Sequence, residues 1–395
     1  MPSKITLALL LSSFLATPAL AQAPACGGNF AQFLEGVRAD AVARGISDEV
    51  ATKALRRASI DNKVLSRDRA QGVFRQTFLE FSRRSVSANR MQVGAQKMKQ
   101  YASTFARAEA EYGVPAAVIT AFWGLETDFG AVQGDFNTLN ALATLAHDCR
   151  RPELFRPQLL SAVEMVARGD LDPATTTGAW AGEIGQVQML PKDIIAYGVD
   201  GDGDGHVNLK KSSEDAIMTA ARFIQALGWR AGDPWLAEVT LPSGNFPLEK
   251  TGLGQGMTLN DWTSLGVSFR NDVPSSKNLP ADLVLPQGRN GPAFLVFPNF
   301  EIYLEWNQSF IYTTSAAYFA TRLAGAKPYD AGNPGDGLGD AAMKQLQQKL
   351  AERGHDVGKI DGILGGGTRA AVRAEQLRLG LPADGWPDQE LLGRL

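Results

Sequence analysis

Apolar residues recur every three to four positions through most of the stretch from Phe30 to about Leu323 in this 395-residue chain. A segment that buries one face at this spacing forms an amphipathic helix. Ser47 is a helix cap by residue type, and Pro115 suits a helix start. The sequence therefore predicts a mainly α main domain. The clearest predicted helices are 29–44, 48–58, 87–112, 115–127 and 214–227.

Residues 327–340 divide the chain, because they are rich in Gly and poor in large apolar side chains. We expect a flexible linker there, after a main domain of residues 22–326. Helical spacing returns in 341–395, with one stripe at Met343, Leu346 and Leu350 and another at Ala371, Val372 and Leu377. This predicts a small domain of three helices. Within the main domain, 242–298 predicts turns and short strands.

The N-terminus has the features of a secretory signal peptide over residues 1–21. Lys4 precedes an apolar run, and Ala19 and Ala21 form a cleavage motif, so the mature chain would begin near Gln22. The apolar run is shorter than the roughly 20 residues that span a bilayer. We expect a periplasmic protein exported by a cleaved signal peptide, with no membrane insertion. Pro24 argues against a lipid anchor on Cys26.

Cys26 and Cys149 are the only cysteines. An exported chain meets an oxidising compartment, so the sequence predicts a disulfide between them. The alternative is two unpaired thiols.

Charge and histidine distribution exclude several classes of function. The net charge is −3 and basic residues are dispersed, so no surface for nucleic acid is expected. His147, His206 and His355 stand apart from one another and from the cysteines, which gives no support for a zinc site or a Ser/His/Asp triad.

Glu126 lies near the end of a predominantly apolar predicted helix. Phe122, Trp123 and Phe129 surround it in sequence. Burial among such rings would raise the pKa of the carboxyl group and keep a proton available for a glycosidic oxygen. The alternative interpretation is a partly exposed glutamate at a helix end.

A second segment, 178–191, combines small residues with polar ones. Gly182 and Gly185 would allow a sugar to approach the backbone closely, and Gln188 offers a donor and an acceptor to a hydroxyl or acetamido group.

These two segments, Trp-Gly-Leu-Glu-Thr at 123–127 and Ala-Gly-Glu-Ile-Gly-Gln-Val-Gln-Met-Leu-Pro at 181–191, resemble the signature segments of family 3 lytic transglycosylases. The membrane-bound lytic transglycosylase B group is the best-known branch of that family. The similarity extends over nearly all of 30–323. It includes the motifs at 112–115, 200–206 and 227–229, in the same order.

The resemblance implies a lysozyme-like α+β catalytic domain in which Glu126 is the only general acid and base. Glu126 would protonate the oxygen between N-acetylmuramic acid and N-acetylglucosamine, then deprotonate the muramoyl C6 hydroxyl, which closes a 1,6-anhydro ring. An internal nucleophile removes the need for a second carboxylate; Glu183 is the only neighbouring candidate for one. The implied substrate contacts are Gln188, Gly182, Gly185, Trp123, Phe223, Trp306 and Asn307.

The chain departs from the family pattern at Ala179, Phe223 and Glu301. Ala179 stands where Ser is frequent, and Phe223 replaces a groove Tyr. Glu301 and Trp306 occupy positions that the family fills with aromatic residues. These differences affect the expected sugar contacts and leave Glu126 unchanged.

The loop after residue 199 matches part of a calcium-binding EF-hand loop. Asp200, Asp202 and Asp204 fall at positions one, three and five, and Asn208 falls at position nine. Position twelve is Lys211 instead of Glu, although Glu214 and Asp215 follow. We expect no required cofactor and hypothesise a structural Ca²⁺; the alternative is a turn with solvated carboxylates.

The C-terminal segment resembles the peptidoglycan-binding domain 1 family, on the Asp361-Gly362 turn, Thr368 and Gln376 among other positions. This implies a wall-binding module that tethers the enzyme to peptidoglycan glycan strands; the alternative is a helical appendage without a ligand. Two rival functions remain at this point: a hydrolytic muramidase and a non-catalytic wall-binding protein. Protein partners are not predicted.

Overall fold

The computed structural model describes residues 26–70, 76–271, 274, 276 and 278–395. The predicted signal peptide and the predicted cleavage site near Gln22 lie outside these residues. Among the described residues, no helix combines the length and the apolar character needed to cross a membrane.

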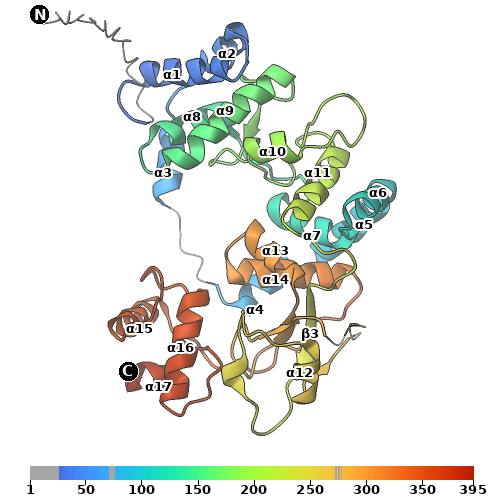
Figure 1. Cartoon of the computed structure of the whole chain (residues 1–395), viewed down its shortest axis with the longest axis vertical. Helices are drawn as coiled ribbons and strands as arrows, with labels where there is room; N and C mark the ends of the chain where they lie inside the picture. Colours follow the sequence, from blue (N-terminus) through green and yellow to red (C-terminus); the bar gives the residue numbers. More distant parts are fainter. Residues whose placement is uncertain (1–25, 71–75, 272–273, 275, 277) are drawn as a thin grey trace, which may run out of the picture.

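The main domain is mostly helical, as predicted, and its helices gather around one large apolar core. In Figure 1, α1–α3 and α8–α10 form one end of the molecule, while α5–α7 and α11 lie beside α13 and α14. The helices are α1 (Phe30–Ala43), α2 (Asp48–Leu55), α3 (Asn62–Arg69), α4 (Phe78–Ser85), α5 (Ala88–Gln100), α6 (Ala102–Tyr112), α7 (Ala116–Thr127), α8 (Thr138–His147), α9 (Pro152–Arg168), α10 (Pro191–Tyr197), α11 (Ser213–Ala226), η1 (Leu248–Lys250), α12 (Leu259–Ser264), α13 (Asn299–Trp306) and α14 (Phe310–Leu323).

Two small antiparallel sheets complete the main domain. The first pairs two very short strands, with Phe136 opposite Gly178. The second has the strand order β4-β3-β6-β5 and packs against α12 in a separate apolar cluster around Trp262. The prediction of turns and short strands in 242–298 is thus confirmed. The strands are β1 (Phe136–Asn137), β2 (Thr177–Gly178), β3 (Leu236–Thr240), β4 (Ser268–Phe269), β5 (Asp282–Val284) and β6 (Ala293–Val296).

Two details of the predicted helices differ from the structure, and a third agrees with it. The predicted helix 87–112 is interrupted at Tyr101, which ends α5 and precedes α6; its ring packs 5.8 Å from that of Trp123. Helix α12 was not predicted, although a capping box between Thr258 and Asp261 starts it. Ser47 caps α2 as expected, by accepting the backbone N–H of Val50.

The disulfide between Cys26 and Cys149 is present, with 5.3 Å between the α-carbons. It fastens the start of the described chain to the α8–α9 connection. The same connection is held by ion pairs from Arg150 and Arg151 to the buried Asp68 at the end of α3. These links join segments that are far apart in sequence.

The C-terminal region forms three helices around its own apolar cluster: α15 (Asp340–Glu352), α16 (Gly366–Arg378) and α17 (Gln389–Arg394). Met343, Leu346, Leu350 and Val372 are buried as the stripes predict, whereas Leu377 is 57% exposed. The expectation for Leu377 is wrong because the side chain lies on the outer face of α16.

The segment between the two domains is held more firmly than its composition suggested. Residues 327–339 form neither helix nor strand. Asp330 nevertheless pairs with Arg270 at 3.0 Å, and the backbone N–H of Asn333 donates to the carbonyl of Asn290. Figure 1 shows the C-terminal helices beside the main domain.

Candidate active site

Glu126 lies in the last turn of α7, a helix that is apolar around nearly its whole circumference and buried over most of its length. The chain turns sharply after this helix: Asp128 and Phe129 have φ values of 53° and 60°, in the left-handed region that non-glycine residues seldom adopt. Phe129 folds back so closely that a Cβ on Gly124 would lie 2.8 Å from its ring. The abrupt end leaves the Glu126 carboxylate facing α13 and α14 instead of another helical turn.

Two donors converge on one oxygen of Glu126. Trp306 Nε1 donates to Oε1 at 2.9 Å, and the Tyr312 hydroxyl donates to the same atom at 2.5 Å. Burial raises the pKa of Glu126, while the hydrogen bonds from Tyr312 and Trp306 act in the lowering direction because they stabilise the carboxylate. The group can therefore hold a proton and still be stabilised after losing it.

Trp306 is fixed by stacking. Its ring lies 4.2 Å from that of Phe122 on α7 and 5.6 Å from that of Phe223 on α11. Asn307 shapes the turn that follows, because its Oδ1 accepts the backbone N–H of Ser309 and its carbonyl accepts the Thr313 hydroxyl. Phe223 and Trp306 are thus brought to Glu126, and Asn307 lies immediately beside them.

The second signature segment is tied directly to the end of α7. The Thr127 hydroxyl donates to the carbonyl of Gln186 at 2.5 Å, and Ala179 and Glu183 close a tight turn through an N–H to carbonyl bond of 2.9 Å. The two segments are more than 50 residues apart in sequence, and these bonds hold them side by side.

Gln188 has φ of 50° and is, with Asp128 and Phe129, one of three non-glycine residues with positive φ in the described part of the chain. Its Nε2 donates to the carbonyl of Gly185 at 2.9 Å and approaches that of Gln133 at 3.4 Å. These bonds occupy the donor end and leave Oε1 as an acceptor. Strained backbone of this kind persists where surrounding structure imposes it, and it is frequent at functional sites.

Glu183 comes into electrostatic range of Glu126. Its Oε2 is buried and has no hydrogen-bond partner among the described residues. Burial raises the pKa of Glu183, and the charge of Glu126 raises it further. The site therefore contains a second carboxyl group that favours the neutral form.

Three predicted substrate contacts are corrected. Trp123 is 0% exposed and packs against Tyr101 and Phe129 inside the core, so it cannot touch a sugar. Gly182 and Gly185 are buried, with φ of 93° and 82°, and a Cβ on either would overlap Leu142 or Leu209. These glycines are required by the packing of the chain itself.

The acidic loop brings one carboxylate oxygen each of Asp200, Asp202 and Asp204 within 4.8 Å of one another. Asp200 accepts the backbone N–H groups of Gly203 and Gly205, which closes the loop. Asn208 Oδ1 accepts the N–H groups of Lys210 and Lys211.

Asp215 clamps both ends of this loop. One oxygen accepts the N–H of Gly201 at 2.8 Å, and the other accepts the N–H of Asn208 at 2.6 Å. Both oxygens of Asp215 are therefore engaged with the backbone of the loop, and the clustered carboxylates are those of Asp200, Asp202 and Asp204.

Sequence reasoning missed Tyr312, which lies 186 residues beyond Glu126. No motif marks it; only the aromatic start of a helix after the Trp306-Asn307 pair could have drawn attention to it. Trp306 was predicted to contact substrate, and in the structure it donates to Glu126.

The family description Transglycosylase SLT domain matches residues 29–321, which include every residue of the site described above. The chain belongs to this family. A second family description, for a peptidoglycan binding domain, matches residues 339–395. The SLT family and the helical architecture agree with the predicted lysozyme-like fold.

Known relatives of this transglycosylase point the same way. SltB3 of Pseudomonas aeruginosa, solved in complex with NAG-anhNAM-pentapeptide, is 36% identical with a TM-score of 0.85; the match covers 93% of this chain and 99% of SltB3. Membrane-bound lytic murein transglycosylase B of Escherichia coli is 29% identical over 252 residues, or 63% of this chain and 68% of the relative. Escherichia coli Slt35, solved in complex with calcium, is 26% identical with a TM-score of 0.63, covering 76% of this chain and 95% of Slt35.

Proposed function

We propose that this chain is a periplasmic lytic transglycosylase that cuts the β-1,4 bond between N-acetylmuramic acid and N-acetylglucosamine and leaves a 1,6-anhydro end, with Glu126 as its general acid and base. The observation that carries the proposal is the largely desolvated carboxylate of Glu126, on which Trp306 and Tyr312 converge. Membership of the transglycosylase SLT family and the anhydro sugar bound to SltB3 support the same chemistry.

The first step uses the proton of Glu126. Because Oε1 accepts both hydrogen bonds, the proton is carried by Oε2. Burial raises the pKa and keeps this proton available near neutral pH. Transfer to the bridging oxygen breaks the bond between that oxygen and C1 of the muramoyl ring, and N-acetylglucosamine leaves as an alcohol.

The second step returns the proton. Glu126 is now a carboxylate, which Trp306 and Tyr312 stabilise, and it accepts the proton of the muramoyl C6 hydroxyl. The oxygen at C6 bonds to C1 and closes the anhydro ring. No water is consumed, and Glu126 ends protonated as it began. A nucleophile on the same sugar supplies the proximity that a separate carboxylate provides in most glycosidases.

Mass spectrometry of the products tests this function. Purified sacculi are incubated with the mature full chain and with Glu126→Gln, and soluble muropeptides are analysed. We expect anhydromuropeptides from the wild type and a loss of about 10²- to 10⁴-fold in the variant, the usual contribution of a general acid or base. Products heavier by one water would identify a hydrolytic muramidase. Binding to sacculi without release of any product would identify a wall-binding protein.

Calcium binding by the acidic loop is a second element of the proposal. Asp200, Asp202 and Asp204 supply clustered oxygen donors, which fit Ca²⁺, while Lys211 cannot act as the ligand at position twelve. The calcium complex of Slt35 supports the assignment. The ion would bridge the loop in front of α11 and stabilise it, with no part in proton transfer.

Thermal unfolding measures calcium binding directly. Millimolar Ca²⁺ should raise the Tm of the wild type, because a ligand present at 100 times its Kd adds about 2.7 kcal/mol to the free energy of unfolding. The same addition should not raise the Tm of Asp200→Asn/Asp204→Asn. An unchanged Tm in the wild type would refute the calcium assignment and leave the catalytic proposal intact.

A further inference from the structure

Arg369 of α16 is inserted into the boundary between the two domains. It is 8% exposed; its guanidinium donates to the carbonyl of Pro286 at 2.7 Å and to that of Leu285 at 3.4 Å. The charge also lies 4.8 Å above the ring of Phe310 and 5.8 Å from that of Trp386. The C-terminal domain is therefore docked on the catalytic domain through a buried cation.

A cavity of about 350 Å³ lies in this boundary, here called the seam cavity. The catalytic domain supplies a largely apolar wall, and α16 supplies a polar wall with two arginines. The lining used in the argument consists of Leu253, Leu285, Phe310, Gly367, Arg369 and Arg373.

Asp384 also lines the seam cavity, so Arg369 and Arg373 face a single carboxylate there. Among the described residues, Arg373 has no hydrogen bond or ion pair, and Arg369 Nε is buried without a partner. Burial and the positive charge of Arg373 lower the pKa of Arg369 to about 9, and the negative charge of Asp384 acts in the opposite direction. Asp384 has the same raising effect on the pKa of Arg373.

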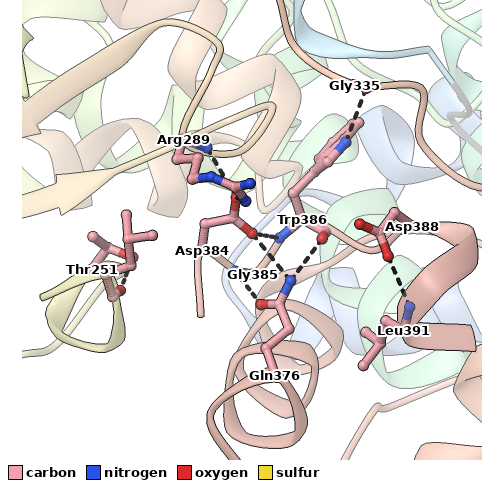
Figure 2. Close-up of polar contacts among 10 residues, drawn as sticks. Thr251, Arg289, Gly335, Gln376, Asp384, Gly385, Trp386, Asp388 and Leu391 are labelled. Carbon is pink, nitrogen blue, oxygen red and sulfur yellow. Dashed lines mark hydrogen bonds and ion pairs between the residues drawn. The ribbon is translucent and has the colours of Figure 1, made fainter. Parts of the chain in front are cut away.

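Asp384 makes no hydrogen bond or ion pair with Arg373 among the described residues, and its oxygens accept other donors. One accepts Gln376 Nε2 at 3.1 Å and the backbone N–H of Trp386 at 3.0 Å. The other accepts the backbone N–H of Arg289 at 3.0 Å. Figure 2 shows Asp384 held between Arg289 and Gln376. Arg369 is buried and Arg373 is partly buried, and neither makes an ion pair among the described residues, so an anion from outside the chain could bind to them.

The shape of the site fits a carboxylate on a peptide. The first turn of the 13-residue helix α16 begins at Gly366, without a side-chain cap, and its backbone N–H groups favour an anion. Planar guanidinium groups bind carboxylates through paired hydrogen bonds. The wall of Leu253, Leu285 and Phe310 suits the aliphatic part of a peptide.

The seam cavity and the reaction centre share helix α14. Phe310 is the first residue of α14, and Tyr312, two residues later, donates to Glu126. Two residues along a helix span about 3 Å of its axis. Residues two apart point to opposite sides of a helix that is about 10–12 Å wide with its side chains, so a ligand in the seam cavity would lie across α14 from the strand held at Glu126.

We propose that the seam cavity binds a carboxylate of the peptide attached to the glycan strand that is being cut, with Arg373 and Arg369 as its binding residues. The inference rests on the proposed function, because peptidoglycan brings the peptide to the site. It makes the C-terminal domain part of the substrate-binding surface and gives the enzyme a preference for strands that carry peptides.

Kinetics on two matched substrates tests this preference. Glycan strands with their peptides and strands stripped of peptides by an amidase are given to the wild type and to Arg373→Gln, and kcat/KM is measured for each. The quantity compared is kcat/KM for strands with peptides divided by kcat/KM for stripped strands. Arg373→Gln should lower this ratio about tenfold, as expected for the loss of one charge-assisted hydrogen bond. A general folding or docking defect would lower both values and leave their ratio unchanged, which would overturn the proposal.

Arg394→Gln is the matched control. Arg394 pairs with Glu390 on the surface of α17, in the same domain but outside the seam cavity. For Arg394→Gln, the ratio of the kcat/KM values for the two substrates should equal that of the wild type. An equal fall in the ratio for both variants would overturn the assignment to the seam cavity.

A binding experiment separates this inference from the proposed chemistry. Full-length Glu126→Gln is titrated by calorimetry with NAG-NAM-pentapeptide and with the same compound after its peptide carboxylates are converted to amides. The free carboxylates should strengthen binding about tenfold, and the added substitution Arg373→Gln should remove this difference. Equal affinities for both compounds would overturn the inference, even if anhydro products are released. Absence of those products would refute the proposed function without deciding this titration.

Discussion

Replacing Tyr312 by Phe should raise the pKa of Glu126 and reduce catalysis. The substitution removes only the hydroxyl that donates to Oε1 at 2.5 Å, and that hydrogen bond lowers the pKa by stabilising the carboxylate. A hydrogen bond to a charged group contributes about 1.5–3 kcal/mol. Trp306 still donates to the same oxygen, so we expect the lower part of this range, or about a tenfold fall in kcat/KM.

The pH profile gives the sign of the effect. The reaction begins with protonated Glu126, so kcat/KM falls as the pH rises through the pKa of this group in the unliganded enzyme. A higher pKa in Tyr312→Phe moves this fall to higher pH. The assay is the initial rate of anhydromuropeptide release across the pH range, measured under subsaturating substrate.

Tyr318→Phe provides the control for this prediction. Tyr318 lies on the same helix, but its hydroxyl accepts from Arg322 and from the backbone of Tyr329, away from Glu126. Its pH profile should match that of the wild type. A shift of the Tyr312→Phe profile to lower pH, or an unchanged kcat/KM throughout, would show that Tyr312 does not act on the Glu126 carboxylate.

Three further predictions concern stability. Removing the disulfide with Cys26→Ser/Cys149→Ser should lower the free energy of unfolding by about 4 to 5 kcal/mol, as measured in urea, and a reductant should then have no further effect. Gly182→Ala should lower the free energy of unfolding, measured in urea, by about 2 to 4 kcal/mol, because φ is 93° and the new Cβ would overlap Leu142. A decrease of less than about 1 kcal/mol would contradict this packing argument. The pKa of Glu183 is raised in the folded chain, so its contribution to stability is present at low pH and is lost as the pH rises through that value. The Tm of Glu183→Gln should therefore exceed that of the wild type at alkaline pH but not at acidic pH. The same difference in Tm at both pH values would show that ionisation of Glu183 does not affect stability.

Much of the architecture followed from local patterns. Helices such as α1, α7 and α11 were predicted because one spacing of apolar residues determines which face is buried. The break at Tyr101 was not predictable in this way, since both halves keep a helical pattern; in the structure the Tyr101 ring packs against Trp123. Likewise, Leu377 fits an apolar stripe but lies on a face that no other element covers.

By itself the sequence determined the helical main domain, the cysteine pair, the C-terminal helices and Glu126 as the candidate acid, because each is encoded by neighbouring residues or by a short motif. Only the tertiary structure decided which groups surround that acid. Tyr312 and Glu183 come near it across long separations, Trp123 is buried in the core, and Arg373 lines a cavity between two domains. Contacts of this kind depend on how distant segments pack, and a linear pattern of residue types does not specify the distance between their side chains.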